Sequence, residues 1–244
     1  MQEFIFVTGM ILKQTPVGEY DRRICLLTKE RGKISAFARG ARKPGSKMAA
    51  GTNPFSFGTF KLYEGKSSYT LADADIQNYF EELRKDYIGA YYGMYFAEVA
   101  DYYTRENNDE VLMMKLLYQS LRALSVPALP KRLVRCIYEI KAIVVNGEFP
   151  GIPAERYMAN RYAADTYATG RDASDGRREG FLQKGLQDST IYAIEYIAAS
   201  TVEKLYTFTV TDSVLVELEE MSAYYRARFM AHEFKSLEIL QTLC

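Results

Sequence analysis

The sequence has 244 residues, 48% of them hydrophobic, and no net charge, which provides enough apolar material for one large domain or two ordinary ones. No stretch approaches the roughly 18 to 20 consecutive apolar residues of a membrane span, and the N-terminus lacks a secretory signal pattern, so we expect a cytoplasmic protein. Cys25, Cys136 and Cys244 lie far apart without a CxxC pair, which argues against a disulfide framework or a thiolate zinc site.

The N-terminal part of the chain predicts a small barrel. Ile34, Ala36 and Ala38 alternate with larger or polar residues, the period of two typical of a strand with one buried face. Gly32 closes a polar turn before this strand and can adopt positive φ, so we expect a hairpin there. Five short strands with a longer connection after the third favour a closed barrel of the OB type. The predicted strands are residues 4–13, 22–28, 33–39, 55–63 and 68–76.

The rest of the chain predicts a helical domain. Apolar residues recur there at spacings of three and four, the pattern of helices that pack on a common core. We therefore predict an α+β protein of two domains, the barrel over residues 1–78 and the helical domain over 79–244. An irregular insertion at about 147–188 contains a polar run that predicts a surface loop. The predicted helices are 79–103, 111–124, 131–145, 190–199 and 212–233.

Residues suited to catalysis are scarce. His232 is the single histidine, and no nucleophile-elbow motif accompanies it. Gly65, Lys66 and Ser67 look like the end of a phosphate-binding P-loop, but Phe60 stands where that motif needs glycine, and strand is predicted where it needs a helix. We therefore expect no enzymatic activity, no cofactor and no metal.

The neutral total conceals a strongly basic segment. Residues 22–47 contain nine basic residues and one acid, Glu30, so the segment carries a net charge of +8 and the rest of the chain carries −8. A cluster of this size is the usual electrostatic footprint of phosphate binding.

These cations alternate with apolar residues on neighbouring strands and continue into a loop rich in glycine and proline, so we expect them to share one face of the barrel. OB barrels bind single strands on the face of strands two and three, where cations contact phosphates and aromatic rings stack on bases. The alternative is an ordinary solvated surface. The predicted nucleic-acid contacts are Arg22, Arg23, Lys33, Phe37, Arg39, Arg42, Lys43 and Lys47.

Several segments resemble the RecO family of bacterial recombination mediators. The most specific is residues 32–44, GKISAFARGARKP, and it is preceded by GEYDR at 18–22. Shorter landmarks follow in the family's order at 145–150, 203–206 and 235–237, so the resemblance spans nearly the whole chain.

This resemblance implies an OB-fold joined to a helical domain, without nucleotide hydrolysis. It also implies a nucleoid-associated protein that binds single- and double-stranded DNA and anneals strands coated by single-strand-binding protein. Such proteins act with RecR, and often RecF, to load RecA. Many members bind zinc through two CxxC pairs after the Asn-Gly-Glu-x-Pro segment, whereas residues 149–187 contain no cysteine or histidine. We therefore predict no zinc, and the shape of the insertion stays open.

The resemblance further implies that the helical domain binds the acidic, hydrophobic-ended C-terminal tail of single-strand-binding protein. Such a tail needs an apolar pocket beside a cation. Ordinary solvated charges above a core stripe are the alternative. A different class of function, a protein adaptor with little DNA affinity, is also compatible with the neutral net charge. The two candidate tail sites are Lys131, Arg132 and Arg135 on one helix and Tyr225, Arg226, Arg228 and Phe229 on another.

Overall fold

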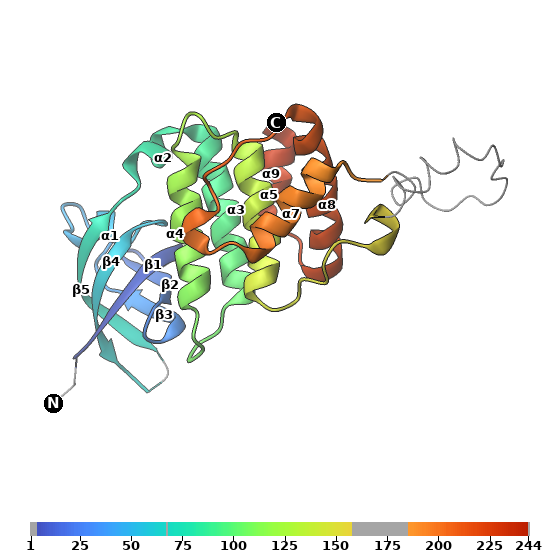
Figure 1. Ribbon diagram of the computed structural model, residues 1–244. Helices are drawn as coiled ribbons and strands as arrows, with labels where there is room; N and C mark the ends of the chain where they lie inside the picture. Colours follow the sequence, from blue (N-terminus) through green and yellow to red (C-terminus); the bar gives the residue numbers. More distant parts are fainter. Residues whose placement is uncertain (1–3, 67, 158–184, 244) are drawn as a thin grey trace, which may run out of the picture.

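The computed structural model describes residues 4–66, 68–157 and 185–243, and it begins with a closed five-stranded barrel (Figure 1). The strand order is β1-β2-β3-β5-β4, antiparallel except for the parallel pair of β3 and β5. The predicted OB-type barrel is confirmed. The strands are β1 (Phe4–Val17), β2 (Asp21–Thr28), β3 (Gly32–Ala38), β4 (Phe57–Glu64) and β5 (Tyr69–Asn78).

The barrel interior follows the alternation in the sequence. Ile24, Ile34 and Phe60 belong to one buried apolar cluster inside the barrel. β1 continues beyond its predicted end because a register shift between Ile11 and Lys13 lets the strand bend and stay paired with β2. A short helix, α1 (Met48–Gly51), lies in the long connection after β3.

The helical domain differs from its prediction at two breaks. One helix was predicted over 79–103, but Asp86 interrupts it, because its carboxylate accepts a hydrogen bond from the Gly89 amide and caps a new helix. The helix predicted over 212–233 ends at Phe229, and a further helix follows. Between them the chain turns and buries both Met230 and Phe234. The elements are α2 (Glu81–Lys85), α3 (Tyr87–Tyr103), α4 (Val111–Leu124), α5 (Lys131–Val145), α7 (Asp188–Ala199), η1 (Val202–Lys204), α8 (Asp212–Phe229) and α9 (Lys235–Leu243).

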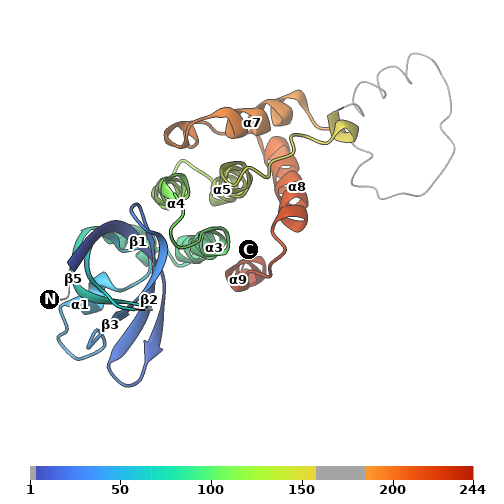
Figure 2. The same cartoon turned by 90° about the horizontal axis from the view of Figure 1, so that it is seen from below.

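The barrel packs directly on the helices. Figure 2 shows α3 and α4 nearest to the barrel, with α5 behind them and α7 and α8 farther out. Met10, Leu12 and Leu27 point out of the barrel and are buried in the same apolar core as the helices. The β2–β3 turn is fixed to the α3–α4 connection by the hydrogen bond from the Lys33 amide to the Arg105 carbonyl, 3.0 Å.

Gly32 in this turn has a φ of +62°, as the sequence predicted. A Cβ there would lie 2.3 Å from the Arg105 carbonyl oxygen, so glycine is required by close approach as well as by backbone conformation. The contact fixes the outer face of β2 and β3 relative to the helices.

Candidate nucleic-acid interface

Two loops meet at one end of the barrel and place cations on its surface. The amide of Gly40, after β3, donates to the Asp21 carboxylate at the start of β2, 2.7 Å. Arg42 is tied to the β1–β2 turn by its amide, which donates to the Tyr20 carbonyl at 2.8 Å, and by its guanidinium, which donates to the Gly18 carbonyl at 3.2 Å. These contacts hold the loop after β3 in place, so Lys43 is presented from a fixed backbone.

The adjoining strand face continues this surface. Arg23 on β2 lies opposite Phe37 on β3, and its Nε donates to the Ser35 hydroxyl at 2.7 Å. Arg39 follows Phe37 by two residues and is exposed. Within the described residues, Arg23, Arg39, Arg42 and Lys43 have no carboxylate partner. We call this surface the basic edge, and it comprises Tyr20, Arg23, Phe37, Arg39, Arg42 and Lys43.

Tyr20 is the member of the basic edge that the sequence prediction missed. Its side chain is 42% exposed, and the Lys43 ammonium lies 5.7 Å from the centre of its ring. An exposed aromatic ring beside cations provides a surface on which a nucleobase can stack. Its position in the turn before β2 could have predicted this place beside the cations. That turn and the loop after β3 border the same end of an OB barrel.

Arg22, also predicted to contact DNA, is used within the fold. Arg22 lies two residues before Ile24 on β2, so both side chains lie on the inward side of the strand. Its guanidinium donates to the Ala49 carbonyl (2.8 Å), the Thr52 hydroxyl (2.7 Å) and the Asn53 side chain (3.1 Å). Burial lowers its pKa, and nearby Arg42 lowers it further. Arg22 therefore secures α1 and the residues after it to the end of the barrel.

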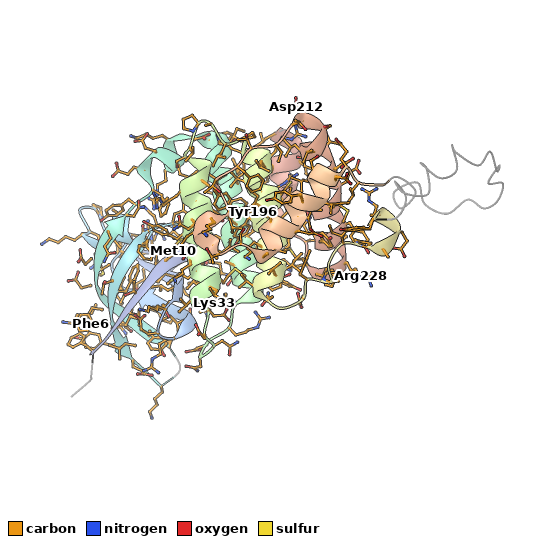
Figure 3. The ribbon with its side chains drawn as sticks, viewed as in Figure 1. Phe6, Met10, Lys33, Tyr196, Asp212 and Arg228 are labelled. Carbon is orange, nitrogen blue, oxygen red and sulfur yellow. The ribbon has the colours of Figure 1, made fainter. Side chains whose placement is uncertain are left out.

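Lys33 is likewise engaged, at the junction of barrel and helices (Figure 3). Its ammonium lies 3.0 Å from the carboxylate of Asp101 on α3, and Lys13 contacts the same carboxylate at 2.6 Å. Partial burial acts to raise the pKa of Asp101, but hydrogen bonds from the two lysines outweigh it and hold that pKa below 3.8. Lys47 is exposed just before α1.

The cations predicted to bind a partner lie on α5 and α8, and most face carboxylates. Lys131 pairs with Asp86 at 2.9 Å, Arg132 makes a two-pronged contact with Glu219, and Arg135 contacts Glu219 at 3.2 Å. These pairs neutralise the charge that a partner would meet, and the solvent-accessible one between Lys131 and Asp86 adds little stability. We call the five cations the helical cation cluster: Lys131, Arg132, Arg135, Arg226 and Arg228.

The α8 part of the cluster reaches into the core. Arg226 contacts the Glu139 carboxylate at 2.8 Å, and Glu139 is fully buried, where it also accepts hydrogen bonds from Tyr95 and Ser222. Tyr225 is buried and donates to the Gly151 carbonyl at 3.0 Å. Arg228 is exposed near the half-buried ring of Phe229 and has no carboxylate partner within the described residues.

Cys25 and Cys136, the two cysteines within the described residues, lie in surroundings that make their thiols unreactive. Burial, followed by the nearby charge of Asp101, raises the pKa of Cys25 to about 12, so its thiolate is scarce at neutral pH. Cys136 is fully buried, and its pKa is also raised. Across residues 4–66, 68–157 and 185–243, no group of three metal-ligating side chains gathers and no helix is long and apolar enough to cross a bilayer. Most of the predicted insertion lies outside the described residues.

The fold and the basic edge together define a class of protein: an OB-type barrel with unpaired surface cations, fixed to a helical domain. Residues 1–80 match the family described as Recombination protein O N terminal, and residues 84–238 match Recombination protein O C terminal. The chain belongs to the RecO family of DNA repair proteins.

Relatives align over nearly the full length. DNA repair protein RecO of Acetivibrio thermocellus is 27% identical, with 98% of this chain and 97% of the relative aligned. DNA repair protein RecO of Clostridium perfringens is 24% identical over 96% of each chain. DNA repair protein RecO of Heliobacterium modesticaldum is 35% identical over 58% of this chain and 51% of its own.

Proposed function

We propose that this protein is a non-catalytic DNA-binding recombination mediator that anneals complementary single strands. In this proposal it acts with RecR to help load RecA on DNA coated by single-strand-binding protein. One observation carries the DNA-binding part: Arg39, Arg42 and Lys43 stand exposed on a fixed backbone without carboxylate partners in the described structure.

The chemistry of the basic edge suits a single strand. Unpaired guanidinium and ammonium groups attract phosphates and release their counterions. The rings of Tyr20 and Phe37 lie among these cations, and rings in such positions accept stacked bases without a strong sequence preference. The phosphate contacts can also be made to a duplex backbone, so the proposal includes double-stranded DNA.

A salt titration tests this proposal. Fluorescent single-stranded DNA is titrated with the wild type and with the triple variant Arg39→Ala, Arg42→Ala and Lys43→Ala. Each lost phosphate contact should lower the slope of log affinity against log salt by roughly 0.7, which corresponds to a loss of about 100-fold for three contacts at about 0.1 M salt.

The matched control removes three exposed cations elsewhere, Lys85, Lys115 and Lys235, and should leave both quantities unchanged. A folded triple variant of the basic edge with wild-type affinity and slope would place the DNA site elsewhere. Wild-type protein without salt-dependent DNA affinity would favour the second candidate function, the protein adaptor. The zero net charge of the whole sequence gives that candidate its support.

We also propose that the helical domain binds the acidic tail of single-strand-binding protein at the helical cation cluster. Arg228 is the strongest candidate because it has no carboxylate partner in the described structure and lies near the ring of Phe229. Calorimetry at low salt should detect an acidic peptide with an apolar end, and Arg228→Glu should abolish that heat while DNA binding persists. No heat with the wild type would remove this proposal, and undiminished heat with Arg228→Glu would remove the placement.

A further inference from the structure

Asp21 is an acid that stands beside the cations of the basic edge. It begins β2, immediately before Arg22 and Arg23. Its half-buried carboxylate forms no ion pair within the part of the chain that the structure describes. A negative charge at this place repels phosphates, so by its charge alone Asp21 weakens the DNA binding proposed above. Its one hydrogen bond in the described structure indicates a contribution of the opposite sign.

This hydrogen bond holds the loop after β3 at its first turn. The chain reverses at Gly40, which has a φ of +66°. The next residue, Ala41, is fully buried in the apolar cluster of the barrel and fixes one side of the turn. The Gly40 amide, in the peptide bond that follows Arg39, donates to the Asp21 carboxylate at 2.7 Å. Hydrogen bonds to an ionised acceptor are roughly twice as strong as those between neutral groups, so Asp21 fixes the peptide next to Arg39.

Asp21 is the one residue of the β1–β2 turn that holds this loop by its side chain, within the residues that the structure describes. The other two contacts use backbone carbonyls: the Arg42 amide donates to Tyr20 at 2.8 Å, and the Arg42 guanidinium donates to Gly18 at 3.2 Å. A substitution at Asp21 therefore changes the hold on the loop while every cation of the basic edge stays in the chain.

We propose that Asp21 is a positioning residue of the basic edge, a role that rests on the DNA site proposed above. Its carboxylate holds Arg39, Arg42 and Lys43 in the arrangement that contacts phosphates. A released loop samples many conformations, and DNA would have to order it on binding, which lowers affinity. The charge of Asp21 is screened by salt, so its repulsion is the smaller effect. Removing this acid should weaken DNA binding, the opposite of what its charge alone predicts.

Two neutral substitutions separate the hydrogen bond from the charge. Asp21→Ala and Asp21→Asn both remove the charge, but only asparagine keeps a side-chain oxygen that can accept from the Gly40 amide. Both are titrated with fluorescent single-stranded DNA across a salt series. Asp21→Ala should bind about tenfold more weakly at about 0.1 M salt, with a slope of log affinity against log salt lowered by roughly 0.7, one phosphate contact. Asp21→Asn should keep the wild-type slope and bind at least as tightly as the wild type.

Hydrogen–deuterium exchange of the DNA-free protein tests the hold on the loop without reference to DNA. Peptides that contain residues 39–43 should exchange faster in Asp21→Ala than in the wild type or in Asp21→Asn. Asp75→Ala is the matched control, because it removes an exposed acid from β5, and Asp75 has no side-chain contact with the loop in the described structure. It should change neither the exchange of residues 39–43 nor the salt slope.

Asp21→Glu keeps the test sharp if Asp21→Ala does not fold. It retains the charge but moves the acceptor by one methylene, so it should also bind DNA more weakly than the wild type. Equal affinity and slope in the alanine and asparagine variants, or wild-type affinity in a folded Asp21→Glu variant, would overturn the role of Asp21 while wild-type DNA binding stands. Wild-type protein without salt-dependent DNA affinity would remove the proposed function and this role with it.

Discussion

The basic edge and the helical cation cluster contain the same residue types but differ in what their charges meet. On the barrel, Arg39 and Arg42 are exposed without carboxylates in the described structure. On the helices, Arg132, Arg135 and Arg226 contact Glu219 and Glu139. A cation that already faces a carboxylate offers little to a phosphate. The proposed function therefore depends on which cations lack a carboxylate partner. A count of basic residues in the sequence does not show this.

The largest expected effect concerns stability in the helical cation cluster. Arg226→Met removes the closest cation from Glu139, a fully buried carboxylate, and leaves it only the longer contact with Arg135, at 4.0 Å, within the described residues. The variant should be less stable by about 3 kcal/mol because a buried charge that has lost its close partner is costly. Urea unfolding measures the difference. Arg39→Met on the basic edge is the control and should change stability by less than about 0.5 kcal/mol. Equal effects at the two positions would erase the distinction between the regions.

The next comparison is between two neighbours on β2. Arg22→Ala leaves three acceptors near α1 without their donor and should cost about 2 kcal/mol of stability. Arg23→Ala should leave stability nearly unchanged and instead weaken DNA binding, because its guanidinium belongs to the basic edge. The pair is measured by urea unfolding and by DNA titration. A stable Arg22→Ala variant with strongly reduced DNA affinity would reverse these assignments.

The smallest effect is the pH dependence of the barrel–helix junction. Because Lys13 and Lys33 hold the pKa of Asp101 below 3.8 in the folded protein, the carboxylate stabilises the fold above that pH. This contribution, about 1 kcal/mol, should disappear as pH falls through the lowered pKa. Asp101→Asn should lose it at neutral pH and show a flatter stability profile below about pH 4. An unchanged profile would mean that the two lysines do not stabilise the junction.

Local patterns were enough to predict the barrel. Alternation around Ile34 and the glycine turn at Gly32 are encoded in neighbouring residues, and both are confirmed. The same alternation places Arg22, two residues before Ile24, on the inward side of β2. The sequence therefore already indicated that Arg22 differs from its exposed neighbour Arg23. By contrast, the break at Asp86 depends on one capping hydrogen bond within an otherwise helical pattern.

The charge pairings could not be predicted because their partners lie far along the chain. Asp101 is 68 residues from Lys33, and Glu139 is 87 residues from Arg226. Whether a cation is free or neutralised depends on the packed fold. α9 escaped prediction for a related reason: the turn after Phe229 is determined by the burial of Met230 and Phe234 and contains no glycine or proline.

The central claim is that free cations on the barrel, and not the paired cations on the helices, contact DNA. Lysine acetylation of the whole protein, read by mass spectrometry with and without single-stranded DNA, tests it without any mutation. Lys43 and Lys47 should be protected by DNA, while Lys115 and Lys131 should react equally in both samples. Protection at Lys131 with unchanged reactivity at Lys43 and Lys47 would contradict the claim.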